Sequence, residues 1–120
     1  MGDISDNFNR SEFECQCGCG KDAVDAELVT ILEVVRLYFG KPVTINSGNR
    51  CERHNAQEGG SKYSQHLYSK AADIRVEGVE AEKVYGFLDN QFKDKYGVGL
   101  YPGRIHIDVR PHRARWKTNI

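Results

Sequence analysis

The sequence predicts an α+β fold, in which an antiparallel sheet is covered by helices packed on it. Two stretches repeat their apolar residues with the period of a helix, and others are short or alternating as strands are. A chain of 120 residues is long enough to bury about two thirds of its unfolded surface in one core. Residues 1–120 are therefore expected to form a single domain.

The first helix is predicted over residues 24–39. Asp25 is placed to cap its N-terminus, because a side-chain oxygen at that point accepts from the unpaired amides of the first turn. Gly40 and Pro42 then end the helix. Its apolar stripe consists of Leu28, Ile31, Leu32, Val35, Tyr38 and Phe39.

A short strand is predicted at residues 43–45, and it leads into a long polar segment. That segment, residues 46–65, contains several glycines and runs for about twenty residues, which is long for a structureless loop in a compact domain. Loops of this length are usually functional or disordered. The chemically capable residues that follow favour a functional loop.

Residues 71–76 alternate as a strand does, and the alternation turns Asp73 away from the core side. A second amphipathic helix is predicted over residues 80–92, where apolar residues recur at every fourth position. These residues are Val84, Leu88 and Phe92, with Tyr85 beside them.

The end of the chain predicts a hairpin. Its strands are residues 97–101 and 104–109, joined by a turn at Pro102 and Gly103. The second strand has the clearest alternation in the sequence, with one apolar and one polar face. Ile105, Ile107 and Val109 form the apolar face, and Arg104, His106, Asp108 and Arg110 form the polar face.

Charge and hydropathy narrow the possible partners. The chain contains 17 basic residues (lysine and arginine) and 17 acidic residues (aspartate and glutamate), so its formal net charge is zero. No overall positive field attracts nucleic acid, and no nucleic-acid partner is expected. No window approaches eighteen apolar residues, and no signal peptide is recognised, so synthesis in a cytoplasm without membrane insertion is expected. In the basic tail, residues 110–117, Trp116 is expected to dock while the charges stay solvated, with contact to an anionic polymer as the alternative.

Four cysteines, Cys15, Cys17, Cys19 and Cys51, leave their chemical state open. Their C-x-C-x-C spacing differs from the C-x-x-C knuckle of zinc fingers. A cytosolic origin favours reduced, inert thiols. A second structural metal site is the next alternative, and disulfides are the third.

A set of metal ligands is offered by His66, Asp73 and His106. Catalytic zinc commonly binds three histidine or carboxylate side chains and keeps a fourth position for water. Such an ion acidifies its water and polarises a carbonyl. Adjacent strands could bring the three residues together, although an ordinary hydrogen-bonded histidine–carboxylate pair is the alternative.

Two further residues are candidates for the chemistry. Asp108 shares a strand face with His106 and is expected to act as general base and acid; it could instead orient His106 or bind the metal itself. Arg50 could hold a substrate carboxylate or stabilise an oxyanion. Its alternative is a surface arginine that binds loop carbonyls.

Three segments in this order, SGNRC, SQHLYSKAAD and GVGLYPGRIHIDVRP, resemble the zinc peptidases of the D-alanyl-D-alanine carboxypeptidase and L-alanyl-D-glutamate endopeptidase family, which share the fold of the Hedgehog signalling domain. The resemblance extends from about residue 8 to residue 116. The leader SEFECQCGCG and the closing segment RPHRARW also resemble those of small phage-associated or bacterial members of the family. The family motif S-x-H-x-x-G-x-A-x-D falls on Ser64, His66, Ser69, Ala71 and Asp73, with Ser69 in the place of the glycine.

The resemblance implies roles for these residues. His66, Asp73 and His106 would bind Zn2+, and Arg50 would contact the substrate carboxylate or the scissile carbonyl. Ser47, Ser64 and Gln65 are the expected substrate-binding neighbours. Many relatives have an acidic base three positions before the last histidine; that position is Gly103 here, so the base is expected to be Asp108.

The expected function is hydrolysis of peptide bonds in peptidoglycan by a zinc-activated water, with a monomeric protein acting at the bacterial cell wall after release or within a phage particle. One alternative is a non-catalytic zinc-containing module of the same fold that binds the cell wall or serves in a virion. In another, the cysteine cluster is a zinc-binding interaction motif and the remainder is scaffold.

Overall fold

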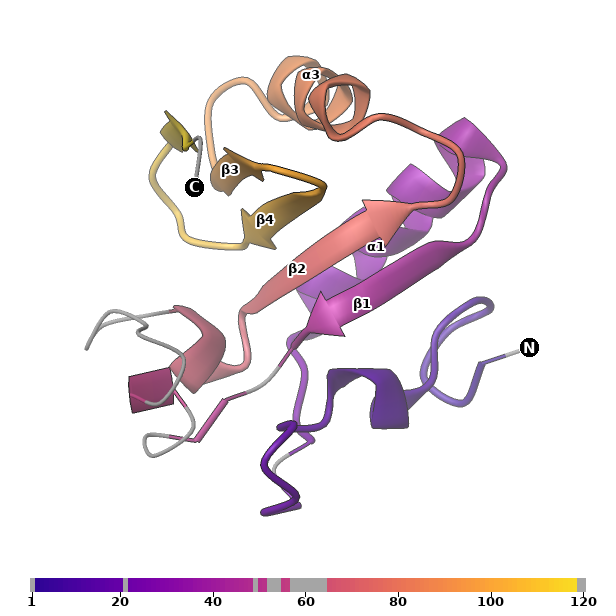
Figure 1. The fold of residues 1–120 in the computed structure, drawn as a ribbon, viewed down its shortest axis with the longest axis vertical. Coiled ribbons are helices and arrows are strands. Elements are labelled where there is room, and N and C mark those ends of the chain that lie inside the picture. Colours follow the sequence, from indigo (N-terminus) through magenta and orange to yellow (C-terminus); the bar gives the residue numbers. More distant parts are fainter. Residues whose placement is uncertain (1, 21, 49, 52–54, 57–64, 119–120) are drawn as a thin grey trace.

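The computed structural model describes residues 2–20, 22–48, 50–51, 55–56 and 65–118. It has the α+β fold that the sequence predicts, with helices packed on one sheet (Figure 1). In chain order they are η1 (Arg10–Phe13), α1 (Ala26–Phe39), β1 (Val43–Ser47), η2 (Gln65–Tyr68), β2 (Ala71–Val76), α3 (Ala81–Gln91), β3 (Gly97–Tyr101), β4 (Arg104–Asp108) and β5 (Ala114–Lys117).

The five strands form one sheet in the order β1-β2-β4-β3-β5. Neighbouring strands are antiparallel except for β3 and β5, which run parallel. The predicted α+β fold with an antiparallel sheet is confirmed, and β5, for which no strand was predicted, joins its edge in the parallel direction. After β4 the chain crosses to the free side of β3, where Ala114 N donates to Tyr96 O and Thr118 N donates to Leu100 O.

Helix α1 follows the predicted bounds closely. The Asp25 side chain accepts a hydrogen bond from Glu27 N at 2.8 Å, and the helix ends at Gly40 in the left-handed conformation. The predicted stripe is buried except at its C-terminal end. Tyr38 is 65% exposed there and stacks on Phe87 of α3, with ring centroids 4.0 Å apart.

The sheet has an apolar face and a polar face. Both helices contribute to the core on the apolar face, and Figure 1 shows α1 behind β1 and β2, with α3 above β3 and β4. The predicted alternation on β2 and β4 is confirmed, because Ile74, Ile105 and Ile107 lie in that core. Asp73 and His106 point to the opposite face and are nevertheless buried.

The N-terminal leader (residues 2–20) is packed against the domain, and its ribbon lies below β1 in Figure 1. Its Phe8 and Phe13 side chains are buried in the same core as the helices. Glu33 on α1 accepts hydrogen bonds from Ser5 Oγ and Asn7 N at 2.6 and 2.7 Å. None of the described helices has the length and apolar composition that crossing a bilayer requires.

Candidate metal centre

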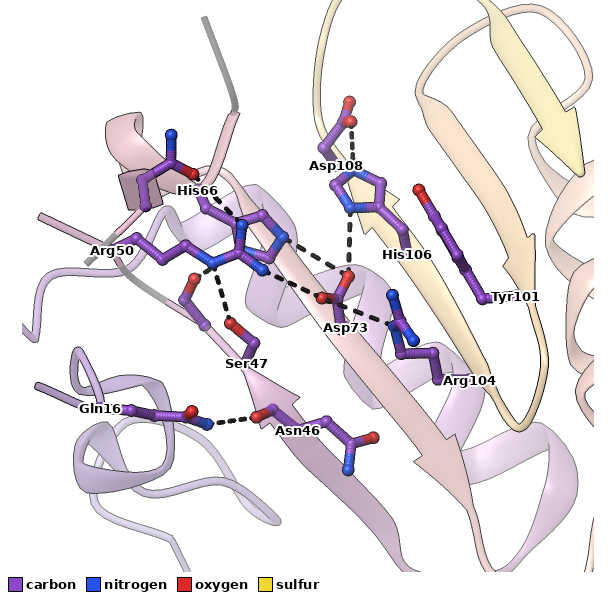
Figure 2. Close-up of polar contacts among 12 residues, drawn as sticks. Gln16, Asn46, Ser47, Arg50, His66, Asp73, Tyr101, Arg104, His106 and Asp108 are labelled. Carbon is purple, nitrogen blue, oxygen red and sulfur yellow. Dashed lines mark hydrogen bonds and ion pairs between the residues drawn. The ribbon is translucent and has the colours of Figure 1, made fainter. Parts of the chain in front are cut away.

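His66, Asp73 and His106 meet on the polar face of the sheet (Figure 2). The register of β2 and β4 places Asp73 directly opposite His106, and His66 reaches the same point from η2. His66 Nε2 lies 3.4 Å from Asp73 Oδ1, and His106 Nδ1 lies 3.2 Å from the same oxygen. The three residues are buried, and their ligand atoms lie within 4.8 Å of one another.

The second nitrogen of each imidazole has a defined partner. His66 Nδ1 donates to the Gly48 carbonyl oxygen at 2.6 Å, and His106 Nε2 donates to Asp108 Oδ2 at 2.7 Å. These bonds fix the tautomers and leave His66 Nε2 and His106 Nδ1 directed at Asp73. Metal-binding histidines usually have such a carbonyl or carboxylate partner.

Asp108 is completely buried behind His106. Its Oδ1 accepts from Arg110 Nε at 2.8 Å and its Oδ2 accepts from Arg110 Nη2 at 2.7 Å, which forms a bidentate pair. Burial alone would raise the pKa of Asp108, but the hydrogen bonds from His106 and Arg110 hold it well below its usual range. The carboxylate therefore stays ionised, with both oxygens engaged.

Asp73 is surrounded by cationic and imidazole groups. Burial disfavours its charged form, but His106 and His66 outweigh burial and hold the pKa of this carboxyl well below its usual range. Its Oδ2 lies 3.5 Å from Arg50 Nη2 and 4.0 Å from Arg104 Nε. Asp73 is thus an ionised ligand candidate with guanidinium groups beside it.

His106 carries a raised pKa, since Asp108 and Asp73 overcome the lowering effect of burial. A metal ion at Nδ1 must compete with a proton for that nitrogen. Metal affinity is therefore expected to fall as the solution becomes acidic.

Arg50 is held at the edge of the site by the polar loop. Its Nε donates to Ser47 Oγ at 3.2 Å, and its Nη1 donates to Asn55 Oδ1 at 3.2 Å. The register of β1 on β2 shifts between Ile45 and Ser47, and this bulge brings Ser47 opposite Asp73. Figure 2 shows the guanidinium directed toward Asp73.

An aromatic side chain that the sequence does not assign to the site lies against it. The Trp116 ring lies 5.2 Å from the His106 ring between centroids, and its Nε1 donates to Tyr101 OH at 2.9 Å. A Cβ on Gly99, which pairs with His106, would overlap the Trp116 indole. The missing side chain at residue 99 therefore makes room for the tryptophan.

Gly97 plays the corresponding part for Asp108, with which it pairs across β3 and β4. A Cβ there would lie 2.5 Å from Asp108 Oδ2 and 2.7 Å from Arg110 Nε. Two glycines at alternate positions, on the strand preceding the H-x-D element, are a sequence signal from which this close packing could have been predicted, but the prediction was not made.

The remaining predicted residues are distributed as follows. Ser47 contacts Arg50, whereas Gln65 begins η2 and accepts from Lys70 N through its carbonyl oxygen at 3.2 Å. Ser64 lies outside the described residues. The sequence gives no indication of a role for Asn55, because nothing in the long polar segment distinguishes this residue; the fold brings it to Arg50.

Ser69 occupies a position where glycine is the favoured residue. Its φ of 62° lies in the left-handed region, and its carbonyl accepts from Asp25 N at 2.9 Å. The chain thus keeps the turn between η2 and β2 with a non-glycine residue, and Asp73 still reaches His66 and His106.

The donor set fits zinc in chemistry and in number. Two imidazole nitrogens and one carboxylate oxygen are the ligand types of catalytic zinc sites, which leave one position for water or substrate. The described atoms already converge, and the partners of His66 and His106 hold the donors in place.

Comparison with known proteins identifies the family of the chain. No curated protein matches the chain significantly. The family model described as Peptidase M15 matches residues 6–108, a range that includes all three candidate ligands, Arg50 and Asp108. The chain therefore belongs to the Peptidase M15 family.

Proposed function

We propose that this protein is a zinc-dependent metallopeptidase that hydrolyses peptide bonds in peptidoglycan stem peptides or cross-links. The observation that carries the proposal is the convergence of His66 Nε2 and His106 Nδ1 on Asp73 Oδ1, at 3.4 and 3.2 Å. Membership of a peptidase family supports a peptide substrate. The three motifs shared with cell-wall peptidases support peptidoglycan as its source.

His66, Asp73 and His106 would hold the ion. Zinc bound there would act as a Lewis acid that polarises a peptide carbonyl and makes water a stronger nucleophile at neutral pH. The protein's own part is to keep the donors oriented through Gly48 and Asp108.

Arg50 is proposed to bind the carboxylate of the substrate or the oxyanion that develops during hydrolysis. Its guanidinium is mostly buried, adjoins Asp73 and is held by Ser47 and Asn55. A guanidinium oriented before substrate arrives stabilises developing negative charge without reorganisation. Ser47, Ser64 and Gln65 remain the proposed substrate-binding neighbours.

For Asp108 the geometry supports orientation of His106 more than proton transfer. Its carboxylate receives hydrogen bonds from His106 and Arg110, and its low pKa makes it a weak proton acceptor. We therefore propose Asp108 as a positioning residue that acts through His106, with the base role as the outcome to be tested against it.

The second candidate is a non-catalytic zinc-containing module of the same fold. The observation that favours it is the complete engagement of Asp108, together with Gly103 at the position where many relatives have their acidic base. A monomer that acts at the bacterial cell wall, after release or within a phage particle, is compatible with either function.

Mass spectrometry of purified peptidoglycan fragments tests these functions. The fragments are incubated with zinc-loaded protein, with chelated protein and with a His106→Ala variant. Arg75→Ala is the matched control, since Arg75 is exposed two residues from Asp73 on the same strand face. Fragment release by the zinc-loaded protein and the control alone is expected, and the masses identify the bond. Zinc binding without any change in the fragments would favour the non-catalytic module.

A further inference from the structure

The structure gathers four cysteines at a place separate from the candidate metal centre. The sulfurs of Cys15, Cys17, Cys19 and Cys51 all lie within 4.8 Å of one another. Three of these residues belong to the N-terminal leader, and Cys51 belongs to the segment after β1. Cys15 is buried, Cys17 and Cys51 are half-buried, and Cys19 is exposed.

The distances between the sulfurs are close to those in a site where four thiolates bind one metal ion. Cys15 Sγ lies 3.4 Å from Cys17 Sγ and 3.9 Å from Cys51 Sγ, and Cys17 and Cys51 are 3.5 Å apart. Four sulfurs bound to one zinc ion at about 2.3 Å would be about 3.8 Å apart. A disulfide requires a sulfur–sulfur distance of about 2.05 Å.

Local structure explains how alternating cysteines reach one point. Gly18 N donates to Cys15 O at 3.2 Å, and Gly18 has a φ of 83°, so the chain turns back on itself between Cys15 and Cys19. Cys51 N donates to Cys15 Sγ at 3.4 Å. Ligands of metal sites commonly have hydrogen-bonding partners of this kind, which hold the ligand atom in place.

We propose that the four cysteines bind a structural zinc ion. Each thiol loses its proton to solvent and contributes one sulfur, so four protein ligands complete the tetrahedron. A closed tetrahedron leaves no position for water or substrate. The ion is thereby structural, in contrast to the three-ligand set of His66, Asp73 and His106.

Such an ion would link the N-terminal leader to the polar segment that contains Arg50. Cys51 directly follows Arg50, whose guanidinium adjoins Asp73, and Cys51 O accepts from Asn55 N at 2.9 Å. Asn55 in turn accepts from Arg50. Zinc at the cysteines would thus fix the backbone at Cys51, which lies between Ser47 and Asn55, the two residues that hold the guanidinium.

Metal counting on the full chain, purified under reducing conditions, tests the proposal. We expect two zinc ions per chain in the wild type and one in Cys17→Ser. His106→Ala is expected to lose the other ion, so the two sites are counted separately. Glu14→Ser is the matched control, since Glu14 is exposed in the same segment and offers no sulfur, and it should keep both ions.

Cobalt substitution supplies a readout that does not depend on a variant folding. Co2+ in a tetrathiolate site gives intense thiolate-to-cobalt charge transfer, whereas histidine and carboxylate ligands do not. The wild type and His106→Ala are expected to show this band, and Cys17→Ser to lack it. The band does not depend on peptidase activity, so a protein that has it and cleaves no peptide would refute the proposed function alone.

Three results would overturn the zinc–cysteine site. In the first, the wild-type protein binds one zinc ion and the His106→Ala variant binds none. In the second, the cobalt-loaded wild type lacks the charge-transfer band. In the third, the mass of the native protein is lower by two hydrogens for each disulfide that has formed. The last two require only the wild-type protein.

Discussion

His106 Nε2 lies 2.7 Å from Asp108 Oδ2, and this contact determines which nitrogen of His106 faces Asp73. Arg110 holds the carboxylate from the other side. The imidazole is therefore oriented by a charged pair that is itself anchored in the fold. Several consequences of this arrangement and of the elements around it can be measured.

Asp108→Asn is expected to weaken zinc binding by about 10- to 100-fold, because the amide cannot accept from His106 and Arg110 as the carboxylate does. Zinc titration against a competing chelator measures the change. Glu77→Gln, an exposed substitution just after β2, is the control and should leave affinity unchanged. Unchanged zinc affinity combined with lost peptide hydrolysis would instead assign Asp108 the base role.

Arg50→Ala is expected to lower kcat/KM for the peptide by about 100-fold or more, while zinc content stays the same. Arg50→Lys should recover little of this loss, because an ammonium cannot reproduce the contacts of a planar guanidinium with Ser47 and Asn55. Steady-state kinetics with metal analysis of the same samples makes the comparison. Full activity in the alanine variant would leave Arg50 a structural residue.

Gly99→Ala is expected to destabilise the protein by about 1–3 kcal/mol, because the new methyl group would overlap the Trp116 indole. Urea unfolding gives the free energy, and tryptophan fluorescence reports displacement of the ring from His106. Gly86→Ala in α3 is the matched control. A Cβ there meets no atom within 4 Å, so it should stabilise the helix by about 0.5–1 kcal/mol.

Ser69→Gly is expected to stabilise the protein by about 1 kcal/mol, because glycine has no Cβ to disfavour a φ of 62°. Ser69→Ala keeps the Cβ and removes only the hydroxyl, so it separates the backbone effect from side-chain bonding. Thermal unfolding of the three proteins measures the difference. If both variants lose stability equally, the serine hydroxyl outweighs the backbone conformation.

Glu33→Gln is expected to destabilise the docked leader at neutral pH and to have little effect in acid. Burial would raise the pKa of Glu33, but hydrogen bonds from Asn7 and Ser5 lower it below its ordinary value of 4.5. Its stabilisation is therefore complete above that pH and is lost as the pH falls through the folded-state pKa. Urea unfolding across a pH series, with chelator present throughout, compares the free energy of unfolding of the variant with that of the wild type. A difference in this free energy that does not change with pH would disprove the role of the ionised Glu33 carboxylate.

The elements that sequence predicts best here have strong periodicity or short-range chemistry. Helix α1 has a defined cap and stop, and β4 has regular alternation, so their bounds and faces follow from local pattern. The grouping of His66, Asp73 and His106 was predicted because the first two are near in sequence and the third lies on the polar face of a strand. The register that pairs Asp73 with His106 meets that expectation.

What the sequence could not predict depends on contacts between distant segments. The sulfurs of Cys15 and Cys51 lie 3.9 Å apart although the two residues are 36 positions apart in the sequence. The packing of the leader against β1 brings them together. The parallel pairing of β5 depends on which edge of β3 is free. Trp116 reaches His106 only through that pairing. Local propensity contains no information on any of these choices.

The alternation on β4 also has a consequence for folding. Ile105 and Ile107 lie in the core, while His106 and Asp108 build the candidate centre from the same five-residue strand. Sliding this strand by one residue against β2 would exchange the two faces, placing the imidazole and carboxylate in the hydrophobic interior and the isoleucines beside Asp73. A misregistered sheet would therefore lose its packing and its ligand set together, so selection for a stable sheet also preserves the candidate centre.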